Sequence, residues 1–218
     1  MTTIPFVAVT SWSDTTPDLD VMFAVEAARR ELPDFCACWG LPVPGIAFFD
    51  RKVEITAHDG MIVSAVDDDG EIGTLGYHTT VAGLPIFLWE SRYGCPVFTH
   101  ELWETLANPD LDRWQTAPDG TEWWLEAADA TQGDSYPVDV EVAGNFSSVL
   151  CSNWLAPAFW GLPNADGSAR LDKMGLVTAP FTLRPGGYSI VRVGGQRQQI
   201  GAARPDKGRS SSRTALLP

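Results

Sequence analysis

The most informative part of the sequence is Tyr93–Asp112, YGCPVFTHELWETLANPDLD. It predicts a helix over Pro96–Asn108, because proline is favoured in the first turn of a helix and another proline follows directly after its end. On this helix His100 and Glu104 lie one turn apart and point the same way. The stretch holds four acids and no Lys or Arg, with apolar residues on both sides. This pattern is not typical of an ordinary surface helix, so we expect the helix to be covered on more than one face.

The helix carries a pattern with metal-binding spacing, His100-Glu101-x-x-Glu104. It differs by one residue from H-E-x-x-H, in which two histidines hold Zn²⁺ and the glutamate acts as general base. Glu104 replaces the second histidine, and a carboxylate oxygen is also a zinc ligand. The bare pattern occurs by chance on solvated helices, but the lack of basic neighbours favours a bound cation. We therefore expect Zn²⁺, or another divalent cation, on His100 and Glu104, with Glu101 taking a proton from water.

A third ligand has three candidates, each with an ordinary structural explanation as well. Asp110 lies six residues after Glu104, in the turn expected to end the helix, and Glu126 lies 22 residues after Glu104 on a predicted strand. His78, at the end of an earlier strand, is either a ligand or a donor to the oxyanion, a role that Tyr77 also fits. Asp129 follows Glu126 closely and is expected to hydrogen-bond a ligand imidazole from the second coordination shell.

The charge of the chain excludes some classes of protein and is unevenly distributed. The net charge of −13 argues against a nucleic-acid binder that acts through phosphate contacts. Residues 201–218 hold four basic side chains against one acid, so this tail carries +3 and the first 200 residues carry −16. No apolar run approaches the roughly 20 residues of a membrane helix. The N-terminus lacks the basic start of a secretory signal, so we expect no secretion by a signal peptide.

The order of predicted elements indicates one α+β protein. A first helix is expected over Asp18–Leu32, ended by Pro33. Strands are expected over Ile4–Thr10, Lys52–Ala57, Met61–Val66, Ile72–His78, Pro85–Glu90, Glu122–Glu126, Val138–Val142 and Tyr188–Val193. We divide the chain into a core over residues 1–142, an irregular C-terminal subdomain over residues 143–200 and a flexible basic tail over residues 201–218. A loop region of about 45 residues is unusual in a compact domain, so we expect it to be functional or bound to a metal or a partner.

Other chemistries have weaker support in the sequence. Neither a nucleophile elbow nor a phosphate-binding glycine loop occurs. The run DDDG at residues 67–70 lacks the rest of a calcium-binding loop. The four cysteines include no C-x-x-C pair, which favours buried free thiols over a zinc ribbon. Nine tryptophans, together with the many acids, leave a glycosidase cleft open as a minor alternative.

Several short motifs occur in an order that resembles a known group of proteins. They are ARRELPDFCACWG at residues 28–40, LGYH at 75–78 with GLP at 83–85, THELWE at 99–104 with NP at 108–109, LEAAD at 125–129, SNWLAPAF at 152–159, DKMG at 172–175, APF at 179–181 and PGGY at 185–188. Across residues 4–193 the chain resembles uncharacterised phage and prophage proteins with a zincin-like, metallopeptidase-like pattern. The chain departs from that pattern at Thr99, Asn108 and residues 128–130.

The resemblance implies a zincin-like core, that is, a twisted mixed sheet with an active-site helix, followed by the irregular C-terminal subdomain. It implies a phage-encoded metal-dependent hydrolase, a metallopeptidase whose substrate is a protein or peptide. The alternative is a catalytically inactive virion structural protein that keeps the fold and binds other virion proteins in a capsid, connector or tail. Either interpretation places the protein in the host cytoplasm during infection or in the virion, with neither nucleic acid nor membrane as a partner.

Overall fold

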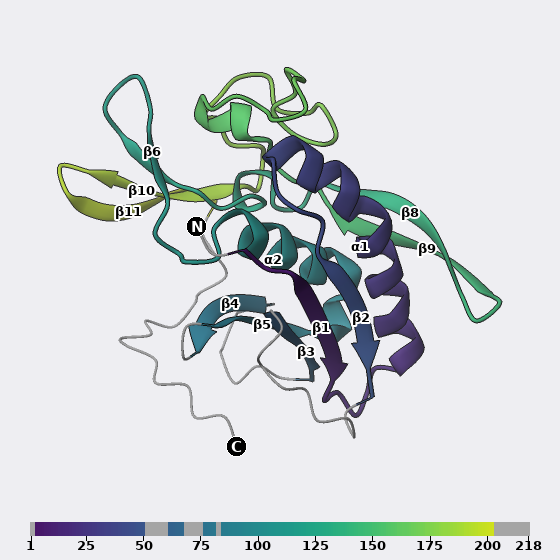
Figure 1. Cartoon of the computed structure of the whole chain (residues 1–218). Helices are drawn as coiled ribbons and strands as arrows, with labels where there is room; N and C mark the ends of the chain where they lie inside the picture. The colour runs from purple at the N-terminus through teal and green to yellow at the C-terminus, as the bar shows by residue number, and fades with distance from the viewer. Residues whose placement is uncertain (1–2, 51–60, 68–75, 82–83, 203–218) are drawn as a thin grey trace.

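The computed structural model describes residues 3–50, 61–67, 76–81 and 84–202. A five-stranded sheet forms one layer, with the strand order β2-β1-β3-β5-β4. Its strands are β1 (Phe6–Ser11), β2 (Gly45–Phe49), β3 (Met61–Val66), β4 (Gly76–Val81) and β5 (Leu84–Glu90). Four of them run parallel, and β4 alone pairs antiparallel to β5 at the sheet edge. The sheet is therefore mixed, with its parallel part joined by a crossover through a helix (Figure 1).

Two helices pack against this sheet and against each other. α1 (Asp18–Trp39) forms the crossover from β1 to β2, and α2 (Cys95–Ala107) follows β5 after a short 3-10 turn, η2 (Ser91–Tyr93). The predicted helix over residues 96–108 is thus confirmed to within one residue at each end. Neither of these described helices has both the length and the apolar character that crossing a membrane requires.

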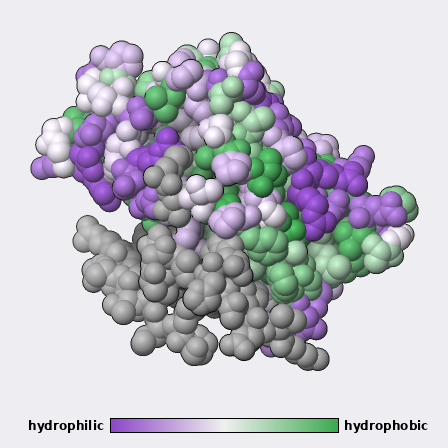
Figure 2. Space-filling view, viewed as in Figure 1, coloured by the Kyte–Doolittle hydropathy of each residue, from purple (hydrophilic) through white to green (hydrophobic). Residues whose placement is uncertain are grey.

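The C-terminal half adds two smaller antiparallel units. A four-stranded sheet of order β11-β10-β7-β6 contains β6 (Trp114–Thr116), β7 (Glu122–Trp124), β10 (Tyr188–Val193) and β11 (Gln196–Gly201). A hairpin of β8 (Ser135–Val142) and β9 (Asn145–Ser152) packs on both helices and projects from the body (Figure 1). Its projecting end mixes apolar and hydrophilic residues (Figure 2), and Phe146 is 77% exposed there. Two short 3-10 turns, η3 (Asp129–Thr131) and η4 (Pro157–Trp160), complete the described elements.

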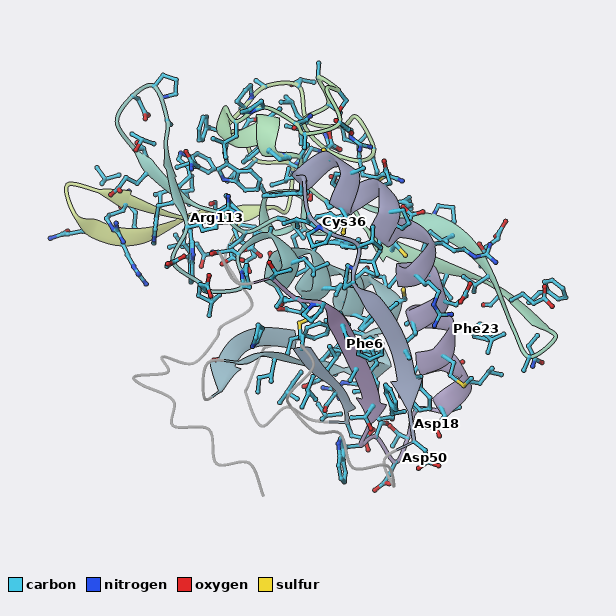
Figure 3. The ribbon with its side chains drawn as sticks, viewed as in Figure 1. Phe6, Asp18, Phe23, Cys36, Asp50 and Arg113 are labelled. Carbon is cyan, nitrogen blue, oxygen red and sulfur yellow. The ribbon has the colours of Figure 1, made fainter. Side chains whose placement is uncertain are left out.

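The structure corrects two predictions about where elements end. α1 continues through Pro33 to Trp39, because Pro33 lies on the exposed side while Phe35 and Cys36 extend the buried face of the helix. Packing of that face outweighs the roughly 3 kcal/mol that an internal proline costs. The predicted loop region of about 45 residues, 143–187, also contains a regular strand, since β9 pairs with β8 along its whole length. The boundary drawn at 142/143 consequently falls inside this hairpin. Cys36 and Phe23 lie on α1 (Figure 3).

Three expectations concern residues that the structure does not describe. The predicted strand Lys52–Ala57 lies outside the described residues, as do residues 72–75 of the predicted strand Ile72–His78. The basic tail falls outside them from residue 203 onward. All four cysteines are buried and free, as expected, and the Sγ atoms of Cys95 and Cys151 lie 3.8 Å apart.

The core is centred on aromatic rings from three separate segments. Phe35 of α1 stacks on Trp103 of α2 with ring centroids 4.8 Å apart, and Trp154 meets Phe35 edge-on at 5.2 Å. All three side chains are fully buried. Aromatic pairs of this kind add about 1 kcal/mol each beyond the burial of their area. These contacts fix α1 against α2 on one side and against the segment after β9 on the other.

One buried carboxylate organises the segment between β9 and β10. Asp172 accepts hydrogen bonds from the side-chain amide of Asn153 at 2.8 Å and from the backbone amides of Leu176 and Val177 at 3.1 and 2.9 Å. The carbonyl of the Asn153 side chain in turn accepts the amide of Met174. The Asp172 side chain is completely buried. A loop with little regular structure is thus ordered by side-chain acceptors in place of a strand ladder.

Replacing Asp172 with Ala is expected to lower the free energy of unfolding by about 3 kcal/mol, because two buried backbone amides lose their acceptor. The measurement is urea unfolding followed by tryptophan fluorescence and circular dichroism. Asp139→Ala on the exposed side of β8 is the matched control and should change this free energy by less than about 0.5 kcal/mol. Equal stability of the two variants would contradict the role given to Asp172.

Asp34 ties α1 to the same segment through a pH-dependent interaction. Its carboxylate accepts hydrogen bonds from Arg170 and Lys173 at 2.9 to 3.0 Å, and the bonds to Arg170 do most to lower the pKa of this carboxyl. A carboxyl whose pKa is lower in the folded state stabilises the fold above its unfolded pKa and loses this contribution as the pH falls. Between pH 6 and pH 3, Asp34→Asn should therefore lose less unfolding free energy than the wild type. Parallel pH curves for the two proteins in urea unfolding would refute this.

A candidate metal centre on helix α2

Helix α2 is buried on nearly every side, and this burial defines the candidate site. Glu101 and Glu104 are 5% and 4% exposed, and the side chain of His100 is 14% exposed. The helix is held by β9, because Ser152 donates its amide to Thr99 Oγ1 at 2.8 Å and its carbonyl accepts Trp103 Nε1 at 3.2 Å. The acidic face of α2 is thus enclosed by the protein, as the absence of Lys and Arg predicted.

The three side chains of the H-E-x-x-E pattern lie close enough to share a cation. His100, Glu101 and Glu104 each offer one ligand atom, and these atoms lie within 4.8 Å of one another. His100 Nε2 is 3.2 Å from Glu104 Oε1, as the i,i+4 spacing predicts. His100 Nε2 is also 3.3 Å from Asp129 Oδ1, which comes from η3. One imidazole and three carboxyl groups therefore lie close together where α2 faces η3.

Burial and charge act against each other on the pKa values here. Burial lowers the pKa of His100, but the negative charge of Glu104 and hydrogen bonds with Asp129 and Glu104 outweigh it and raise this pKa well above its usual range. Burial raises the pKa of Glu104, and the charge of Asp129 adds to this rise, while His100 opposes it. The imidazolium form of His100 thus supplies positive charge among the buried acids.

The end of α2 connects the helix directly to the segment that carries the other acids. Asn108 is fully buried, and its side-chain amide donates to the carbonyl of Leu125 at 3.2 Å. Its side-chain oxygen accepts the amides of Asp112 and Arg113 at 3.2 Å. Arg113, labelled in Figure 3, donates to the carbonyl of Ala107 at the end of α2. These bonds set the position of Leu125, which directly precedes Glu126.

The predicted site residues fall into three groups. His100, Glu101, Glu104 and Asp129 come together around α2. Glu126 is buried shortly after β7, whereas Asp110 lies in the exposed turn after α2. The backbones of Tyr77 and His78 lie in β4, paired with Leu88 and Phe87 of β5, and their side chains lie outside the described part of the structure. Their expected role at the oxyanion therefore stays a prediction.

Gly76, which was not among the predicted site residues, lies directly against the Glu101 side chain. A Cβ atom at this position would lie 2.9 Å from Val97 Cγ1, 3.0 Å from Glu101 Cγ and 3.1 Å from Glu101 Oε1. The backbone of the edge strand β4 thus approaches the Glu101 side chain as closely as a glycine allows. In the sequence, Gly76 lies inside the predicted strand Ile72–His78 and in the LGYH motif at residues 75–78.

Comparison of the chain with protein-family models, with curated proteins and with solved structures finds no match.

Gly76→Ala is expected to displace the Glu101 carboxylate and to lower the free energy of unfolding by about 1–3 kcal/mol, because the added methyl group overpacks a buried contact. Thr79→Ala, on the same strand, is the control and should cost less than about 1 kcal/mol. Chemical unfolding of both variants measures this. A Gly76→Ala variant as stable as the wild type would contradict this prediction, because it would show that the space beside Gly76 accepts a methyl group.

Proposed function

We propose that this protein is a metal-dependent hydrolase of the zincin-like type that acts on protein or peptide substrates. The observation that carries the proposal is the buried His100-Glu101-Glu104 group, whose ligand atoms lie within 4.8 Å of one another. The mixed sheet with α2 packed on it also has the arrangement expected of a zincin-like core, a mixed sheet with an active-site helix. A buried acidic face without neighbouring lysine or arginine on the helix favours a bound cation.

The chemistry of the donors fits a divalent cation. Imidazole nitrogen and carboxylate oxygen are both ligands of Zn²⁺ and of other divalent transition metals. His100 and Glu104 would hold the cation, together with an acid from the segment after β7. A cation bound there lowers the pKa of water and polarises a carbonyl oxygen. Because each ligand carboxylate adds negative charge, this cation is a weaker Lewis acid than one held by histidines alone.

The protein's own groups then perform the proton transfers. Glu101 follows His100 directly on α2 and is held against the backbone of Gly76, so its carboxylate has a fixed position beside the ligands. It accepts a proton from the attacking water and returns a proton to the leaving nitrogen as the amide bond breaks. Enclosure by β9 and η3 limits the access of other water to this position.

Glu101→Gln is expected to reduce the hydrolysis rate at least 100-fold, because general-base catalysis contributes about 10²–10⁴ in rate. Initial rates on fluorescent casein and on a quenched peptide library, with Zn²⁺ present, measure this. Glu141→Gln on the exposed side of β8 is the control and should keep the full rate. An unchanged rate in Glu101→Gln would refute the mechanism.

A second candidate function is that of a virion structural protein, and the hairpin favours it. Phe146 and Leu150 of β9 are 77% and 48% exposed on an element that projects from the body (Figure 1). Two large exposed apolar side chains on one projecting strand offer a contact surface for another protein.

Removal of residues 201–218 distinguishes the two functions. An enzyme should keep its hydrolysis rate without this tail. An assembly protein that binds its partners through the tail should no longer be incorporated into the virion.

A further inference from the structure

Two carboxylates from different elements converge on one nitrogen of His100. Glu104 Oε1 lies 3.2 Å from Nε2, and Asp129 Oδ1 lies 3.3 Å from the same atom. An imidazole nitrogen has one lone pair, or one proton, directed outward in the ring plane. Two oxygens at nearly equal distances therefore share the position that this nitrogen faces. A cation in front of this nitrogen would lie on the side from which both carboxylates approach.

We propose that Asp129 is a direct ligand of the cation, together with His100 and Glu104. This rests on the cation site of the proposed function and changes the expectation for Asp129. A carboxylate of the second coordination shell binds the ring nitrogen that the metal leaves free, and so orients the imidazole from behind. Asp129 instead faces the nitrogen that also faces Glu104. Its position is therefore that of a ligand.

The turn that carries Asp129 is fixed by its neighbours, as a ligand requires. Arg184 donates its backbone amide to the carbonyl of Ala130 at 2.9 Å, and Thr131 Oγ1 donates to the carbonyls of Ala128 and Asn153. A Cβ at Gly187 would lie 2.2 Å from the carbonyl oxygen of Ala130. The backbone of Gly187, which directly precedes β10, thus approaches η3 more closely than a residue with a side chain could. The geometry of Asp129 is thus set before a cation binds.

Ligand exchange with a spectroscopic cation tests this assignment. In Asp129→Cys the new thiol has about the reach of the carboxylate, and a thiolate bound to Co²⁺ absorbs in the near ultraviolet through charge transfer. Glu126→Cys is the matched control, since Glu126 is also buried and only three residues away. The wild-type chain gives the baseline for the four native thiols. The full chain is stripped with EDTA and titrated with Co²⁺ under reducing conditions.

The expected result is a charge-transfer band in Asp129→Cys and none in Glu126→Cys. A band in Glu126→Cys alone would overturn the assignment and leave the cation site standing with a different third ligand. Failure of the wild-type chain to bind either Co²⁺ or Zn²⁺ would overturn both this inference and the proposed function. That outcome would leave His100 as an imidazolium paired with buried acids.

If the cysteine variants fold poorly, the affinity for Zn²⁺ measured by isothermal titration calorimetry provides a second test of the assignment. Zn²⁺ titrated into Asp129→Asn should bind at least 100-fold more weakly than into the wild type, while Glu126→Gln and Asp110→Asn should bind within about tenfold of it. Circular dichroism shows that each variant is folded. Equal losses in Asp129→Asn and Glu126→Gln would contradict the proposal.

Discussion

The burial of acids on α2 is the constraint on which the rest of this structure depends. Removing carboxylates from water costs several kcal/mol each unless positive charge accompanies them. The neighbouring carboxylates favour the imidazolium form of His100, and they raise its pKa well above the usual range despite burial. A divalent cation would supply more positive charge at the same position. The imidazole of His100 is therefore the group that both Glu104 and Asp129 approach.

Covering α2 is the task that most other elements share. The sheet, α1 and β9 each pack on it, and the stacked rings of Phe35 and Trp103 join it to α1. Asn108 links its end to Leu125, in the segment that leads to η3, and His100 lies beside Asp129 of that turn. The C-terminal half therefore forms one side of the candidate site.

How much of this was predictable depended on whether the cause was local. The helix over α2 and the shared direction of His100 and Glu104 follow from prolines and helical spacing, and both are confirmed. The predicted end of α1 at Leu32 was wrong, because tertiary packing of Phe35 outweighed the local effect of Pro33. The order around Asp172 has no sequence periodicity, since its partners are amides brought in by the loop itself. Asp129 was expected beside a ligand imidazole and lies there, but no spacing rule over the intervening 29 residues predicts that it faces the same nitrogen as Glu104.

The dependence of one loop on a single carboxylate has a consequence for motion. Because Asp172 holds the amides of Leu176 and Val177 and the side chain of Asn153, these bonds form and break together. Trp154, which directly follows Asn153, packs on Phe35 beside α2. If these bonds are lost together, the loop would open at a free energy that differs from that of unfolding the sheet. Hydrogen exchange at those two amides would report how often this loop opens while the rest of the protein stays folded.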